Sequence, residues 1–285
     1  MALTKLDWTT PRPIIAIRAD DGADETYTDL YPMLAALGVP ATISVIPWII
    51  GEDGFCTAAQ LNEMEADGWG FAMHGGWSEV AWDGESDPDA PWKLKYYNAD
   101  DVCNLKDALD LAWETWKTKM AAYSWTDANK PKVAVVPNHD IDIECVPSVI
   151  RAGYRYLTSP QVYSGANYEG ISSAGGYNNW GIFNKLQEQW WNRYRLKLFC
   201  PFLTSTATQY TAQMRWAIAT KSPMVILIHP NLMDAAALAD LQAAVELGIE
   251  HGAVFTTLDS LFDYCFDPRN PHLTQANRNI IPHGV

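Results

Sequence analysis

The stretch Ile14-Ile15-Ala16-Ile17-Arg18-Ala19-Asp20-Asp21-Gly22 decides the fold class. It is a short apolar run, rich in β-branched residues, that stops at two adjacent carboxylates and a glycine. A run of this kind is typical of a buried parallel strand. Parallel sheets and barrels carry their chemistry at the C-terminal ends of such strands. Two acids there indicate divided roles, one binding a cation and the other transferring a proton. The alternative is an Asp-Gly turn with solvated carboxylates.

The composition is that of a large globular chain that does not bind nucleic acid. The 285 residues fit a single α/β barrel, and the 48% hydrophobic content is enough for a large core. A net charge of −14 opposes binding to a phosphate backbone. The five cysteines are odd in number and form no C-x-x-C pair, so we interpret them as small buried hydrophobes.

From the sequence as given we expect neither a membrane span nor a signal peptide. The sequence lacks any run of about 18 apolar residues, and the first residues, MALTKLDWTTPRP, lack the apolar segment of a signal peptide. We therefore expect no membrane insertion, and a protein that is cytoplasmic or carried in a larger assembly such as a virion.

Predicted strands alternate with predicted helices along the whole chain. After the first strand, strands are expected at 40–46, 69–73, 132–136, 154–157, 195–200, 224–228 and 254–256, and helices at 24–38, 57–67, 100–123, 146–152, 208–220, 235–247 and 258–264. This alternation predicts one α/β domain over 1–285, with a parallel sheet that is closed or nearly so. Its core spans about 12–262, and a polar tail occupies 265–285.

Polar side chains follow several of these strands. Asp20 and Asp21 end the first strand, His74 the third, His139 the fourth, and His229 the strand at 224–228. A single histidine at a strand end is more often structural than functional. Three of them together with an aspartate pair indicate a site at the C-terminal edge of the sheet.

Five segments also occur in a recognisable order: 18–22 (RADDG), 34–45 (LAALGVPATISV), 68–74 (GWGFAMH), 227–229 (LIH) and 255–261 (FTTLDSL). This order resembles the polysaccharide deacetylase family, the NodB-homology or carbohydrate esterase 4 group. The segments are similar to its T-F-D-D-G motif, its G-V-x-A-T-F-F-V strand, the strand before its H-[ST]-x-x-H motif, its L-x-H motif and its F-V-T-L-D-E-L ending. The resemblance covers roughly 12–262.

The resemblance implies a distorted (β/α) barrel of NodB type with parallel strands. It also implies metal-dependent removal of acetyl groups from an N- or O-acetylated carbohydrate. By position, Asp21 and His74 would bind the metal, which is expected to be zinc, with cobalt or nickel as alternatives. Asp20 would be the general base and His229 the general acid, with Leu227 lining the pocket for the acetyl methyl group.

The chain departs from the family pattern at the metal site. The second histidine of the H-[ST]-x-x-H motif is replaced by Ser78, a poor zinc ligand. Glu79, His139 or Asp140 would have to supply the third ligand, or else the metal binds weakly or not at all. The arginine that would orient the base in the third motif is also replaced, by a valine.

Three further residues are assigned to substrate binding: Trp77, Pro137 and Trp180. Pro137 lies in the segment 136–140 that takes the place of the third motif, and Asn179-Trp180 is the counterpart of the fourth motif's Asp-Trp. These patterns favour a deacetylase-like hydrolase acting on the amide or ester bond of an acetyl group. The alternatives are a catalytically reduced NodB-fold protein that binds glycan, as an adhesin or virion component, and a hydrolase of a non-sugar amide.

Overall fold

The structure, a computed structural model, describes residues 12–74, 102–135, 140–142, 146–158, 161–163, 177–178, 180–181, 197–199, 207–221 and 224–266. Within these ranges, ten strands form one sheet, and two further strands, β5 (Asp140–Asp142) and β7 (Gln161–Tyr163), form a separate parallel pair.

The centre of the large sheet is parallel. Its strands lie in the order β10 (Lys197–Phe199), β11 (Met224–Ile228), β1 (Ile14–Ala19), β2 (Thr42–Val45), β3 (Gly70–His74), β4 (Val133–Val135) and β6 (Tyr156–Thr158). A further strand, β12 (Val254–Thr256), runs parallel to the first half of β1, and β2 pairs with its second half. The predicted parallel α/β architecture is confirmed.

The edges of the sheet differ from the prediction. The two-residue strands β8 (Tyr177–Asn178) and β9 (Trp180–Gly181) pair antiparallel with β10 and β6. No pairing between these two edges closes the sheet within the described ranges. The chain there is rich in Gly, Ser and Asn and shows no periodicity, so its strands could not be predicted from the sequence.

Side-chain alternation along β1 gives the sheet two different faces. Ile15, Ile17 and Ala19 face the outer helices and belong to the main hydrophobic core. Ile14 and Ala16 point to the opposite face, where they pack with residues of the C-terminal helix. Arg18 and Asp20 continue this second series, so a strand-end acid is carried on the inner face.

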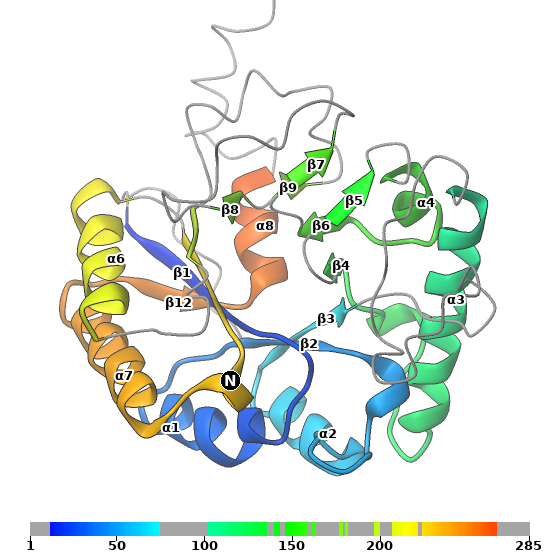
Figure 1. Ribbon diagram of the computed structural model, residues 1–285, viewed down its shortest axis with the longest axis horizontal. Helices are drawn as coiled ribbons and strands as arrows, with labels where there is room; N and C mark the ends of the chain where they lie inside the picture. The colour runs from blue at the N-terminus through cyan, green and yellow to red at the C-terminus, as the bar shows by residue number, and fades with distance from the viewer. Residues whose placement is uncertain are drawn as a thin grey trace, which may run out of the picture.

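The helices cover the outside of the sheet (Figure 1). They are α1 (Tyr31–Ala36), α2 (Ala58–Ala66), α3 (Val102–Lys119), α4 (Val146–Arg151), α6 (Ala207–Thr220) and α7 (Ala235–Glu250), while α8 (Leu258–Phe266) packs on the inner side. Thr57 forms a capping box with Gln60 at the start of α2. Among the described helices, none has the length and apolar character that a membrane crossing requires.

The single helix predicted at 24–38 is wrong in detail. The chain instead forms a π-helical turn, η1 (Thr26–Leu30), followed by α1. Pro32 lies in the first turn of α1, where its missing N–H interrupts the regular hydrogen-bond ladder. The change of helix type therefore occurs next to the proline.

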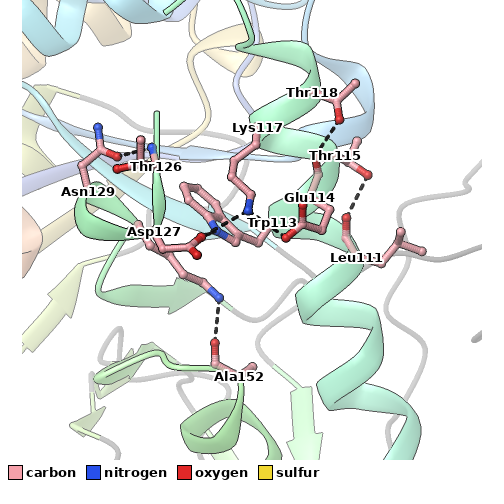
Figure 2. A network of polar contacts seen from close by, with 11 residues as sticks. Leu111, Trp113, Glu114, Thr115, Lys117, Thr118, Thr126, Asp127, Asn129 and Ala152 are labelled. Atoms are coloured by element: carbon pink, nitrogen blue, oxygen red, sulfur yellow. Dashed lines mark hydrogen bonds and ion pairs between the residues drawn. The ribbon is translucent and has the colours of Figure 1, made fainter. Parts of the chain in front are cut away.

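A polar network joins α3 to the segment that precedes β4 (Figure 2). The indole of Trp113 donates a hydrogen bond to Asp127 Oδ1 at 2.6 Å, and Lys117 lies 3.2 Å from the same oxygen. Asp127 begins the 3-10 turn η4 (Asp127–Asn129), and Lys130 just beyond it donates to the carbonyl of Ala152 at 2.7 Å. These contacts fix the chain where it enters β4, the strand beside the one that ends in His74.

Candidate active site

The end of β1 places a buried ion pair on the inner face of the sheet. Arg18 and Asp20 are two residues apart, so both side chains point the same way. The Arg18 side chain is completely buried, and its Nη2 donates to Asp20 Oδ2 at 2.6 Å. The backbone N–H of Asp20 also donates to the carbonyl of Ile228 at 3.0 Å, which ties the ends of β1 and β11 together.

Asp20 is held in its ionised form. Burial alone would raise its pKa, but Arg18, His74 and His229 outweigh burial and lower the pKa from 3.8 to about 2. Its second oxygen, Oδ1, is buried and has no hydrogen-bond partner among the described residues. The residue therefore carries one paired oxygen and one buried oxygen with lone pairs available to accept a proton.

Asp21 lies in a different environment from Asp20. Its backbone has φ 74°, an uncommon conformation for a residue with a side chain, and Gly22 follows with φ 76°. The chain thus leaves the extended conformation at Asp21, whose side chain is about one-third exposed (33%) and lies beside two histidines. Such backbone strain persists where surrounding structure holds it, commonly at functional sites.

His74 joins Asp21 to the neighbouring strands. Its Nε2 lies 3.0 Å from Asp21 Oδ1, and its Nδ1 lies 3.3 Å from the carbonyl oxygen of Val135, to which an Nδ1–H donates. Burial would lower the pKa of His74, but Asp20 and Asp21 outweigh burial and raise it. Because Nδ1 is hydrogen-bonded to the carbonyl of Val135, Nε2 is the nitrogen that faces Asp20 and Asp21.

His229 completes the cluster from the other side of β1. It follows β11, and its Nε2 lies 3.9 Å from Asp21 Oδ2. Its side chain is 26% exposed, so solvent reaches it. Leu227, predicted to line the acetyl pocket, is fully buried on the same inner face and is in register with Arg18. Leu227 therefore lies within β11, two residues before His229, which follows the end of the strand.

The donor set of Asp21 and His74 fits part of a divalent-metal site. A carboxylate oxygen and an imidazole nitrogen are zinc-type ligands. The carbonyl of Val135 orients the ring in the way that outer partners of metal-binding histidines do. Within the described ranges, no group of three His, Cys, Asp or Glu is arranged to hold a metal. A metal held by this pair would therefore require at least one further ligand from outside the four described residues.

Several predicted residues lie outside the described part of the chain: Trp77, Ser78, Glu79, Pro137 and His139. Asp140 begins β5 and Trp180 begins β9, but the structure does not describe their side chains. The described site consists of Asp20, Asp21, His74 and His229, which come from the ends of β1, β3 and β11.

The sequence interpretation missed Arg18. The resemblance implies an arginine after the fourth strand, and a valine is the nearest equivalent residue there. The period of two along β1 gave a usable signal, because a charged residue two positions before Asp20 must share its face.

Comparisons with known proteins bear on the family and the fold of this chain. A family model described as polysaccharide deacetylase matches residues 7–157. Among curated proteins, no sequence match was found.

Several solved structures share the fold. They include the Xyl-CE4 domain of a multidomain xylanase from a Trinervitermes trinervoides hindgut metagenome, with 16% identity, TM-score 0.51 and coverage of 88% of this chain and 90% of that chain. A second is a family 4 acetyl xylan esterase from Clostridium thermocellum, in complex with cobalt. It has 17% identity and a TM-score of 0.50, and the match covers 87% of this chain and 90% of that chain. A third, described as a putative polysaccharide deacetylase from Mycobacterium smegmatis, has 13% identity and a TM-score of 0.53. The match covers 98% of this chain and 96% of that chain.

These identities are low, so the solved structures establish the fold alone. The family model, by contrast, matches more than half of the sequence. This chain belongs to the polysaccharide deacetylase family.

Proposed function

We propose that this protein is a metal-dependent hydrolase that removes acetyl groups from an acetylated carbohydrate. The observation that carries the proposal is the contrast between two adjacent carboxylates. Asp20 is buried, ionised and bound to Arg18, whereas Asp21 is partly exposed and contacts His74. Two neighbouring acids in different environments suit different roles in one reaction.

In this proposal, Asp21 and His74 would hold the metal together with a third ligand, Glu79 or His139. A divalent ion bound there would lower the pKa of a water molecule and polarise the acetyl carbonyl. Zinc suits the nitrogen and oxygen ligands, and cobalt or nickel would serve in the same set. Cobalt is also the ion of the C. thermocellum esterase structure.

Asp20 would act as the general base. Its carboxylate stays ionised at neutral pH, and Oδ1 is the oxygen without a partner among the described residues, so it can accept a proton from the attacking water. The low pKa of Asp20 makes it a weak base. It could therefore deprotonate only a water molecule whose own pKa the bound ion has lowered. A new C–O bond then forms at the acetyl carbonyl.

His229 would act as the general acid. It lies across Asp21 from His74 and is partly exposed, so a leaving group that enters from solvent can reach it. It would donate a proton to the departing nitrogen or oxygen as the C–N or C–O bond breaks. The products are acetate and a free amine or hydroxyl on the sugar.

The proposal is tested by acetate release from acetylated chito-oligomers and from acetylxylan by zinc-loaded protein. Asp20→Asn should lower the rate by about 100-fold or more, with metal content unchanged. The matched control is Asp29→Asn, which neutralises an exposed carboxylate of η1 and should keep full activity.

Three outcomes would contradict the proposal. The first is no acetate release by the unmodified protein with zinc, cobalt or nickel on either substrate. The second is full activity in Asp20→Asn. The third is loss of metal in Asp20→Asn, which would mean that the two aspartates have the opposite roles.

A further inference from the structure

Arg18 is a completely buried cation near the C-terminal end of β1. It is among the largest fully buried side chains of the described chain. Removing a guanidinium from water is unfavourable unless a counter-charge and hydrogen bonds compensate for the lost hydration. Replacing such a pair by apolar residues is often neutral or stabilising, so fold stability alone is a weak reason for its presence.

The backbone at Arg18 is paired with a neighbouring strand on each side. Arg18 is in register with Leu227 of β11 on one side and with Thr42 of β2 on the other. Thr42 in turn accepts a hydrogen bond from the backbone N–H of Leu258 at 2.8 Å, which fixes the start of α8 against this part of the sheet. A guanidinium on such a strand can hold its partner in one orientation.

The contact between Arg18 and Asp20 distinguishes the two carboxylate oxygens. Nη2 of Arg18 binds Oδ2 at 2.6 Å. His74 Nε2 lies 3.9 Å from the same Oδ2, beyond hydrogen-bond distance. Oδ1 is left buried with no partner among the described residues. Oδ2 is therefore bound to Arg18, and Oδ1 keeps its lone pairs available to accept a proton.

We propose that Arg18 is a positioning residue that fixes the Asp20 carboxylate through Oδ2, so that Oδ1 is the oxygen that accepts the proton. This inference rests on the proposed function. It also explains how the chain dispenses with an arginine after its fourth strand, since the guanidinium comes from the strand that carries the base. Arg18 and Asp20 both lie at the end of β1, so the base is oriented from within its own strand.

The test compares Arg18→Lys and Arg18→Met with the unmodified, zinc-loaded protein. Lysine keeps the charge but lacks the planar fork of donors, so the two residues are not interchangeable in such a contact. We expect kcat to fall about tenfold in Arg18→Lys and about 100-fold in Arg18→Met, because misplacing a catalytic group by about 1 Å has effects of that size. KM and metal content should stay within about twofold.

The control is Lys119→Met, which removes an exposed cation that pairs with Glu52 at 3.0 Å. It should leave kcat unchanged. A merely structural role for Arg18 would lower the yield of folded protein or its melting temperature but not kcat per folded, metal-loaded molecule. Unchanged kcat in both Arg18 variants would overturn the inference.

Crystal structures supply a readout that does not depend on activity. In Arg18→Lys and in the double variant Arg18→Met/Asp20→Asn, which removes both buried charges, we expect the side chain at position 20 to change rotamer. An unchanged orientation in both would overturn the positioning role even if the unmodified protein released no acetate. Absence of acetate release with a rotated side chain would instead refute the proposed function and retain the role of Arg18.

Discussion

The ionised state of Asp20 predicts a specific dependence of stability on pH. In the folded protein the pKa of Asp20 is about 2, compared with 3.8 for an unperturbed aspartate. The group therefore stabilises the fold above pH 3.8, and this stabilisation is lost as pH falls through the folded value near 2. At about 1.4 kcal/mol per pH unit, the difference corresponds to about 2 kcal/mol.

The measurement is the free energy of urea unfolding of metal-free protein between pH 5 and pH 2, followed by tryptophan fluorescence. Asp20→Asn lacks the titrating group. The stability difference between the unmodified protein and Asp20→Asn should therefore shrink by about 2 kcal/mol over this range, in favour of the variant at low pH. The raised pKa of His74 does not interfere, because stabilisation from that group is fully present below its unfolded pKa of 6.5 and is lost only at higher pH.

The matched control is again Asp29→Asn, whose carboxylate is exposed. The difference in free energy of unfolding between Asp29→Asn and the unmodified protein should change much less between pH 5 and pH 2. A difference between the unmodified protein and Asp20→Asn that stays constant from pH 5 to pH 2, or that grows, would refute the reasoning. It would mean that Arg18 and the histidines do not offset the burial of Asp20.

Two further predictions concern the metal ligands and the packing of the sheet. Of Glu79→Ala and His139→Ala, the variant that loses bound zinc on elemental analysis identifies the third ligand, and retention of zinc by both would exclude these two residues. Gly70→Ala should destabilise the fold by about 1–3 kcal/mol in urea unfolding, because the added Cβ would lie 2.7 Å from Thr257 Cβ and 2.8 Å from Thr42 Oγ1. Unchanged stability there would show that α8 can shift away from β3 at little cost.

The central strands could be predicted from the sequence because burial on both faces leaves a simple signal. The fully buried strand at 224–228 was predicted with the bounds that the structure shows. The partly buried strand at 254–256, which pairs with β1 off the main strand order, was also predicted with its observed bounds. Each is a short run of apolar or β-branched residues between polar or turn residues. The rule that parallel strands present their C-terminal ends at one edge then placed Asp20, Asp21, His74 and His229 near one another.

Other features depend on tertiary contacts and leave little trace in the sequence. The pair between Arg18 and Asp20 follows from alternation, but nothing in the local pattern shows that a guanidinium can be buried completely there. The edge strands β8 and β9 are two residues long, too short to carry a period. The π-helical turn before α1 arises from the local hydrogen-bond arrangement near Pro32, which propensity alone does not specify.

The central claim is that the adjacent acids after β1 have separate roles, Asp21 on a metal and Asp20 on Arg18. The most direct measurement is anomalous diffraction from a crystal soaked in zinc. We predict one anomalous peak within bonding distance of Asp21 and His74 Nε2, with Asp20 still bound to Arg18 and not in contact with the metal. A peak on Asp20, or no peak beside Asp21 and His74, would contradict this division of roles.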